Sequence, residues 1–222
     1  MRSLFAGQLP SAVIFDLDGT LVDSVPDLHC AVQTLQQQLG LALSQESEVR
    51  LWVGNGAAKL VQRALAASAG DDADELFPRA MELFMAAYGR SNGEQARLYD
   101  GAQVLLQALA AAGVPLALVT NKPLAFTQPL LEALDIGHCF SVILGGDSLP
   151  QKKPDPAPLL AAVARLGLPV RTCLMVGDSI NDLLAARAAG MPIACVSYGY
   201  NHGEPIALSH PDLLVDSLAK LL

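Results

Sequence analysis

Two aspartates separated by one leucine, Asp16 and Asp18, stand directly after a short apolar run and just before a glycine and a threonine. Alternate residues of an extended segment point to the same side, so both carboxylates can face one site while Leu17 packs away. Two carboxylates in one pocket need a bound cation, or one of them must hold a proton. The pair therefore indicates a metal-binding or proton-transferring site, although a strand that ends in an aspartate turn would give the same pattern.

Two further polar segments follow apolar runs later in the chain. Thr120 and Asn121 offer a hydroxyl and backbone N–H groups to an anionic oxygen, but they also fit an ordinary helix cap. Lys152 and Lys153 precede Pro154, and a lysine ammonium is a compact positive charge for phosphate oxygens. A solvated loop explains the two lysines equally well.

The fourth segment places Asp178 where another apolar run stops, and Asp182 four residues later. The two side chains share a face if the helix has begun, whereas Asp178 alone is also a plausible helix N-cap. Together, the four segments supply a carboxylate nucleophile, a proton carrier, oxyanion donors, a fixed cation and carboxylates for a metal, as phosphoryl transfer requires. A ligand set made of oxygens, without His or Cys, favours Mg²⁺.

The elements that carry these segments alternate in type. Short apolar strands are expected at 12–15, 116–120, 142–144, 173–176 and 193–196, and helices at 104–112, 127–134, 156–166, 182–189 and 211–222. Strands that are apolar throughout and alternate with helices predict an α/β fold with a Rossmann-like parallel sheet covered on both faces. Polar chemistry collects at the carboxyl ends of such strands, where all four segments fall.

Between Asp23 and about Gly93 no strand is expected, and helical patterns cover 26–39, 57–68 and 74–88. This stretch predicts a helical insertion after the first strand. We therefore expect a catalytic core formed by 1–22 and 93–222, and an inserted helical cap domain formed by 23–92.

Composition excludes several classes of partner. The 222-residue chain has a formal net charge of -8, which argues against nucleic acid and an anionic membrane surface. Its four cysteines are scattered, as expected of free thiols in a reducing compartment. The first ten residues lack an apolar signal core, and the apolar run 104–119 is interrupted by Gln107, Gly113 and Pro115. A cytoplasmic protein, monomeric or homodimeric, is expected.

The ordered set of motifs resembles the haloacid dehalogenase superfamily, and specifically its phosphatases. Its finer sequence is similar to the bacterial phosphoglycolate phosphatase family in FDLDGTLVDSVPDL (15–28), WVGNGA (52–57), TNKP (120–123), KKPDPAPL (152–159) and VGDSINDLLAARAAG (176–190). The resemblance implies that Asp16 attacks phosphorus and forms an aspartyl phosphate. Asp18 would protonate the leaving oxygen and then deprotonate the attacking water.

The resemblance also implies the remaining roles. Thr120 and the Asn121 backbone would hold the phosphoryl oxygens, and Lys153, which directly precedes the proline, would neutralise the phosphate. Mg²⁺ would be held by the Asp16 carboxylate, the Asp18 backbone carbonyl and the Asp178 carboxylate. Asp182 is expected to support the site rather than bind the metal.

The inserted helices resemble the cap of this superfamily, which closes over the site and excludes water. Its substrate-facing loop would be 51–56, with Gly54, Asn55 and Gly56 as candidate substrate-binding residues, because the glycines let the backbone approach a small ligand. Lys59 and Arg63, four residues apart on the following helix, could meet a substrate carboxylate or could form a solvated helix face.

The substrate expected from the resemblance is a small phosphorylated metabolite, with 2-phosphoglycolate first. A sugar-phosphate phosphatase, a phosphomutase of the same superfamily and a non-catalytic phosphate-binding protein are the alternatives. Dehalogenation is disfavoured because the dehalogenases of this superfamily lack the second aspartate. Pure binding is disfavoured because it gains nothing from Asp18.

Overall fold

The computed structural model describes residues 1–222, and its centre is a six-stranded parallel sheet with the strand order β5-β4-β1-β6-β7-β8. The strands are β1 (Ala12–Phe15), β4 (Leu116–Val119), β5 (Val142–Leu144), β6 (Cys173–Gly177), β7 (Ile193–Val196) and β8 (Leu213–Val215). Strands β1, β4, β6 and β7 are buried along their whole length, as expected of a sheet covered on both faces.

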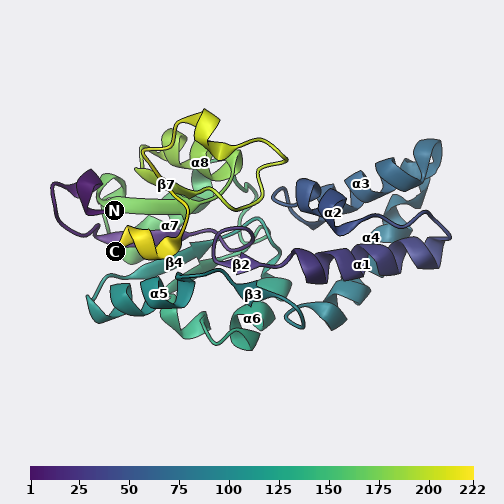
Figure 1. The fold of residues 1–222 in the computed structure, drawn as a ribbon, viewed down its shortest axis with the longest axis horizontal. Coiled ribbons are helices and arrows are strands. Elements are labelled where there is room, and N and C mark those ends of the chain that lie inside the picture. The colour runs from purple at the N-terminus through teal and green to yellow at the C-terminus, as the bar shows by residue number, and fades with distance from the viewer.

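Helices cover the two faces of the sheet in pairs (Figure 1). On one face, α5 (Ala102–Ala111) and α6 (Leu124–Ala133) pack against Val13 and Phe15 of β1. On the other face, α7 (Ala157–Leu166) and α8 (Ile180–Ala189) pack against Ala12 and Ile14. The alternation of β1 side chains between two apolar clusters follows from the two-residue period of a strand. The structure thus confirms the predicted α/β fold.

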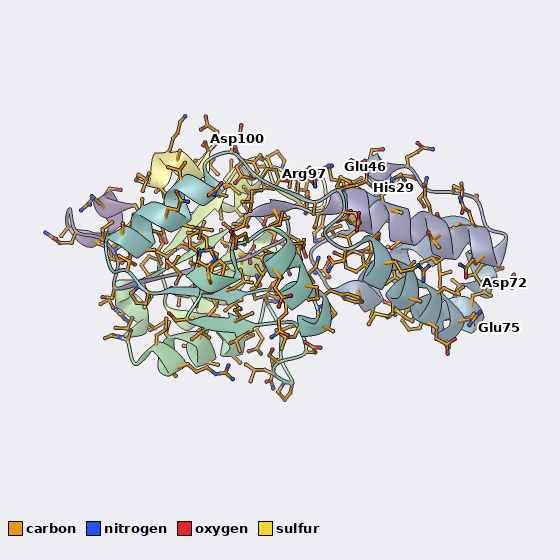
Figure 2. All side chains as sticks on the ribbon, turned by 90° about the horizontal axis from the view of Figure 1, so that it is seen from below. His29, Glu46, Asp72, Glu75, Arg97 and Asp100 are labelled. Carbon is orange, nitrogen blue, oxygen red and sulfur yellow. The ribbon has the colours of Figure 1, made fainter.

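A separate group of four helices follows β1 and lies at one end of the molecule, opposite the chain termini (Figure 1). We call α1 (Val25–Leu39), α2 (Glu46–Trp52), α3 (Ala57–Ser68) and α4 (Ala73–Ser91) the helical layer. It has its own apolar cluster, which Phe126 and Tyr200 join from outside the layer. Figure 2 shows Asp72 and Glu75 at the tip of the layer that is farthest from the sheet.

The chain leaves the sheet for the helical layer and returns from it through a short antiparallel ribbon, β2 (Val22–Asp23) paired with β3 (Arg97–Leu98). Arg97 lies between the two parts of the molecule (Figure 2). Beside this ribbon, the buried Asp27 carboxylate accepts hydrogen bonds from the backbone N–H groups of Gly93 (2.8 Å), Gln95 (2.8 Å) and Ala96 (3.2 Å). These hydrogen bonds therefore hold the outgoing and returning segments together.

The predicted closing helix at 211–222 is wrong. Leu213–Val215 pairs with β7 as the parallel edge strand β8, and only a 3-10 turn follows at Leu218–Leu221. Asp212 accepts a hydrogen bond from the Ile193 N–H at 2.9 Å and pairs with Arg187 at 2.6 Å, so it fixes the start of this strand. These contacts with β7 and α8 are long-range and override the local helical pattern.

Other differences are smaller. The sequence pattern did not predict α2, which begins with a capping box formed by Gln45 and Glu48, nor the two-residue strands β2 and β3. Helix α8 begins at Ile180 rather than Asp182, so Asp182 lies in its first turn and Ser179 is the N-cap. No helix combines the length and apolar character needed to cross a lipid bilayer.

Candidate active site

The carboxyl ends of β1, β4 and β6 bring the predicted site residues together. β1 lies between β4 and β6, and all three strands run parallel, so the residues that follow them emerge at the same edge of the sheet. Asp16 still belongs to the sheet ladder, because its N–H donates to the Val176 carbonyl at 3.0 Å. Thr120 does the same toward the Leu144 carbonyl at 3.0 Å. Their side chains are therefore held by rigid backbone.

Asp16 lies at the centre of this edge. Its carboxylate oxygen Oδ1 is 2.8 Å from the ammonium of the buried Lys153. This contact is an ion pair, and Oδ1 has no other side-chain partner in the protein. Burial raises the pKa of Asp16 to about 7, with Lys153 acting in the opposite direction. An ionised carboxylate offers about four lone-pair sites, so Asp16 can still bind a cation or attack phosphorus.

Three carboxylates form an acidic cluster at this point: Asp16, Asp178 and Asp182 each offer an oxygen within 4.8 Å of the others. Burial is also the main cause that raises the pKa of Asp178 well above its usual range, and the charge of Asp182 adds to it. Lys153 is the only cation paired with the cluster, at 2.8 Å from Asp16 and 2.6 Å from Asp182. The uncompensated negative charge fits a divalent cation bound by oxygen ligands.

The members of the cluster differ in how fully their oxygens are used. Asp182 accepts from Lys153 through Oδ1, and through Oδ2 from the backbone N–H groups of Asp178 and Ser179 and from the Ser179 hydroxyl. Asp178 accepts one hydrogen bond on each oxygen, from the Thr20 hydroxyl and from the Tyr200 N–H, both at 2.6 Å. Asp182 is thus occupied by the protein itself, whereas Asp16 and Asp178 keep lone pairs for a ligand.

Two glycines enclose the Asp178 carboxylate. A Cβ atom on Gly19 would lie 2.4 Å from Asp178 Oδ2, and a Cβ on Gly199 would lie 2.2 Å from Asp178 Cβ. Gly19 also has a φ of +88°, a conformation that side chains disfavour. The glycine of the DGT segment is therefore required both for the turn and for the close approach of Asp178. No motif in the sequence singles out Gly199 in the same way.

Asp18 has a different environment from Asp16. Its Oδ1 accepts from the ammonium of Lys122 at 2.8 Å and from the Ser24 hydroxyl at 2.6 Å. Lys122 is only 5% exposed and was missed as a site residue in the sequence. The sequence signal that could have identified Lys122 is its position directly after Thr120 and Asn121. Because few lysines are expected to be buried, this signal was weak.

Thr120 and Asn121 lie where the sequence predicted them, but their side chains act differently. The Thr120 hydroxyl accepts from the Lys122 N–H at 3.2 Å, which leaves its own hydrogen free to donate to an anionic oxygen. The Asn121 amide donates to the carbonyls of Lys153 at 2.9 Å and Gly54 at 3.0 Å. Asn121 thus joins the lysine loop to the helical layer, a structural function that the sequence did not indicate.

The loop at Gly54, Asn55 and Gly56 reaches the site from the helical layer. The Gly54 carbonyl also accepts from Asn181 at 3.3 Å, and the Asn55 carbonyl accepts from Lys152 at 3.1 Å. A Cβ on Gly56 would lie 3.1 Å from the Asn121 carbonyl, so the loop passes close to β4. Of the three expected residues, Gly54 and Gly56 line the cavity beside Asp16, whereas Asn55 does not line it and its side chain accepts from Arg63.

Lys59 and Arg63 do not line the site. Lys59 is exposed and donates to Gln62 at 3.0 Å. Arg63 donates to the Trp52 carbonyl at 2.5 Å and to Asn55 Oδ1 at 2.7 Å, so its guanidinium fixes the loop 52–55. The sequence allowed either contact with a substrate carboxylate or a solvated helix face for these two residues. Lys59 lies on a solvated face, and Arg63 fits neither description.

A small cavity, part of it open to solvent, lies between the sheet edge and the helical layer. On the sheet side it is lined by polar residues, namely Asp16, Asp18, Thr120, Asn121 and Lys122. The rest of its wall is mainly apolar, with Leu28, Leu60 and Phe84 from the helical layer and Phe126 from α6. One half of the cavity is therefore suited to a charged group and the other to a small organic group.

The segment that follows β7 contributes residues that the sequence left without a role. The Tyr200 hydroxyl donates to Asp23, and the Tyr198 hydroxyl donates to the Thr20 carbonyl at 2.8 Å. The His202 ring lies 2.9 Å from the Leu51 carbonyl of α2. This segment thus contacts the acidic cluster through Tyr200 and the helical layer through His202.

Comparison with known proteins agrees with this geometry. The family model of the haloacid dehalogenase-like hydrolases matches residues 10–190. The chain belongs to this family of hydrolases, and so it is an enzyme.

Among the relatives, a phosphoglycolate phosphatase from Pseudomonas savastanoi pv. phaseolicola is 50% identical over 224 residues, covering 100% of this chain and 82% of that protein. A phosphoglycolate phosphatase from Nitrosococcus oceani is 45% identical over 213 residues, covering 96% of this chain and 95% of that protein. The crystal structure of a predicted phosphoglycolate phosphatase from Haemophilus somnus has a TM-score of 0.91 and 40% identity, covering 95% of this chain and 96% of that chain.

Proposed function

We propose that the protein hydrolyses 2-phosphoglycolate to glycolate and inorganic phosphate through a phosphorylated Asp16. The observation that carries this proposal is the buried Asp16 carboxylate, whose Oδ1 lies 2.8 Å from the Lys153 ammonium in a cavity shared with Asp18. The names of the relatives at 50% and 45% identity support the choice of substrate.

In the first half-reaction, an Asp16 oxygen attacks phosphorus and the bond from phosphorus to the ester oxygen breaks. Asp18 gives its proton to the leaving ester oxygen, which departs as the glycolate hydroxyl. Lys153 offsets negative charge on Asp16 and the phosphoryl group, and the free hydroxyl hydrogen of Thr120 donates to a phosphoryl oxygen.

In the second half-reaction, the Asp18 carboxylate takes a proton from a water molecule, whose oxygen attacks phosphorus. The bond from phosphorus to Asp16 breaks, and the original carboxylate and the protonated Asp18 are restored. Lys122 and Ser24 keep the Asp18 carboxylate oriented during both steps, since they contact its Oδ1 at 2.8 and 2.6 Å.

The acidic cluster fits Mg²⁺, which would be held by the Asp16 and Asp178 carboxylates and the Asp18 backbone carbonyl. The ion would neutralise the repulsion between these carboxylates and an incoming phosphate dianion. Asp182 is a supporting residue in this scheme, because both of its oxygens already accept hydrogen bonds from the protein.

The helical layer is proposed to act as a cap domain formed by residues 23–92, with the core formed by 1–22 and 93–222. Its loop contributes Gly54 and Gly56 to the wall of the cavity that contains Asp16. Closure of such a layer excludes bulk water from the phosphorylated aspartate until hydrolysis.

The small number of basic side chains at the cavity favours a phosphatase over a mutase that handles two phosphate groups. Besides Lys153, which is committed to Asp16 and Asp182, Lys122 is the only basic residue that lines the cavity. A second phosphate dianion would therefore meet a single positive charge.

The test is a phosphate-release assay with Mg²⁺ across small phosphomonoesters, using the wild type, Asp16→Asn and Asp18→Asn. Asp16→Asn should lose nearly all turnover because an amide cannot form the phosphorylated intermediate. Asp18→Asn should lose roughly 100-fold or more in kcat, since an amide cannot carry the proton. A well-folded Asp16→Asn protein with most of its activity would overturn the mechanism, and a clear preference for another phosphomonoester would overturn the substrate.

A further inference from the structure

Where the polar sheet side of the cavity meets its mainly apolar wall, one cation faces one unsatisfied hydroxyl. These groups are the Lys122 ammonium, at the end of β4, and the Tyr88 hydroxyl, on α4 of the helical layer. They approach the cavity from different parts of the molecule, and the roles proposed above for turnover leave Tyr88 without any function.

Tyr88 is a polar side chain held in place without a polar partner. It is 1% exposed, and its hydroxyl has no hydrogen-bond partner in the protein. Its ring stacks on Phe84 with centroids 5.5 Å apart and lies against Phe126 at 4.8 Å. A buried hydroxyl without a partner is unfavourable relative to the phenyl ring of phenylalanine, which would fit the same space. Because the ring lines the cavity, a ligand can supply the missing partner.

Lys122 faces the same tyrosine. Its ammonium lies 4.9 Å from the centroid of the Tyr88 ring and 2.8 Å from Asp18 Oδ1, its one acceptor in the protein. A lysine ammonium has three N–H donors, so two remain for a ligand. A fixed cation beside an unsatisfied hydroxyl is the donor set that a carboxylate accepts from.

The other basic residues near the cavity are committed elsewhere. Lys152 donates to the Asn55 carbonyl, Arg63 donates to Trp52 and Asn55, and Lys59 lies exposed beside Gln62. None of the three lines the cavity. A negatively charged leaving group would therefore find its positive partner only at Lys122.

We propose that Tyr88 and Lys122 together bind the carboxylate of the leaving group, so that the site selects phosphate esters of short 2-hydroxy acids. This inference rests on the proposed function and adds the residues that give it specificity. The contact between Lys122 and Asp18 limits the length of the leaving group, because Asp18 protonates the ester oxygen. A carboxylate bound to Lys122 must therefore lie within one or two bonds of the carbon that bears this oxygen. The apolar wall then faces the remaining substituent of that carbon, which in glycolate is hydrogen.

The test compares kcat/KM for 2-phosphoglycolate and 2-hydroxyethyl phosphate, which differ in having a carboxylate or a neutral hydroxymethyl group at the same position. Tyr88→Phe keeps the ring and removes only the hydroxyl. It should lower the ratio of the two kcat/KM values roughly 10-fold, mainly through the KM for 2-phosphoglycolate, because a hydrogen bond to a charged group is lost. Lys122→Gln should lower both values, because it also contacts Asp18, and should lower the ratio further.

Tyr99→Phe is the matched control. Tyr99 also has a buried hydroxyl without a partner, but its ring packs on Tyr198 at 4.3 Å and does not line the cavity. The ratio of the two kcat/KM values for Tyr99→Phe should equal that of the wild type. A preference for 2-phosphoglycolate that survives Tyr88→Phe overturns this inference alone. A wild type that hydrolyses 2-hydroxyethyl phosphate and not 2-phosphoglycolate overturns the proposed function as well.

Discussion

The two aspartates that follow β1 differ in their cationic partners. Asp16 lies against Lys153, which it shares with Asp182, while Asp18 lies against Lys122 and Ser24. Unequal surroundings are what allow two neighbouring carboxylates to take different roles in one reaction. The resemblance to the haloacid dehalogenase superfamily pointed to Lys153, because a proline follows it. The sequence did not point to Lys122, because only the contact with the Tyr88 ring of α4 and the burial of its side chain reveal its place in the site.

At the same scale, Asp178→Asn should make the metal-free protein more stable while it removes the response to Mg²⁺. Desolvation and the neighbouring carboxylates disfavour the charged form of Asp178, and asparagine removes this charge. An asparagine can still accept from the Tyr200 N–H and donate to the Thr20 hydroxyl oxygen, so both local hydrogen bonds can persist. The melting temperature in EDTA should rise by a few degrees.

Asp182→Asn is the comparison for that experiment. Asp182 accepts from three donors at Oδ2 and from Lys153 at Oδ1, so an amide would place N–H groups against existing donors. This variant should be destabilised. An Asp178→Asn protein that melts below the wild type in EDTA would show that the hydrogen bonds of Asp178 outweigh the repulsion.

At the scale of elements, the buried Asp27 of α1 connects the two crossings between the sheet and the helical layer. Its carboxylate accepts hydrogen bonds from three backbone N–H groups in the returning segment 93–96. Because the Asp27 side chain is fully buried, water cannot replace it as the acceptor. The sequence contains no local signal for this contact, since its partners lie more than sixty positions away.

Asp27→Ala should destabilise the protein by about 3 kcal/mol, because several backbone donors are left buried without an acceptor. The measurement is the midpoint of urea unfolding with an unchanged m-value. Asp27→Asn keeps one acceptor oxygen and should show a smaller loss. Asp71→Ala, at an exposed position of the helical layer, is the control and should change stability by less than about 0.5 kcal/mol. Equal midpoints for Asp27→Ala and the wild type would contradict the fastening role.

The elements also differ in how strongly their local sequence specifies them. The five apolar strands β1, β4, β5, β6 and β7 were predicted, because a buried parallel strand is a continuous apolar run bounded by turn residues. The pattern at 211–222 predicts a helix where the structure has β8, because this strand is partly exposed and depends on its long-range pairing with β7. The strands β2 and β3 have only two residues each and are too short to display a period. The edge of the sheet that carries the site could be predicted, because polar residues follow parallel strands at their carboxyl ends.

At the scale of the whole molecule, the acidic cluster makes stability depend on both pH and metal. The folded-state pKa of Asp16 is raised to about 7 from 3.8, so between these values the folded protein binds more protons than the unfolded chain. Stability from this group therefore falls as pH rises through that window, and Asp178 acts in the same direction. A bound divalent cation replaces the protons and removes the penalty.

The acidic cluster should therefore make the melting temperature in EDTA lower at pH 8 than at pH 5.5. The increase produced by millimolar Mg²⁺ should be larger at pH 8, where protons no longer compete for the carboxylates. Asp178→Asn serves as the control, because it should show little increase at either pH. An equal Mg²⁺ effect at both pH values would mean that the ion binds outside this cluster.

The Gly54 carbonyl, which accepts from Asn121 at 3.0 Å and Asn181 at 3.3 Å, has a kinetic consequence. Both amides belong to the core and the carbonyl belongs to the helical layer, so any movement of the layer that widens the cavity must break the two bonds together. Association then becomes a gated process. In stopped-flow mixing, the observed rate should level off at high ligand concentration, and the plateau should report the opening rate of the molecule rather than diffusion.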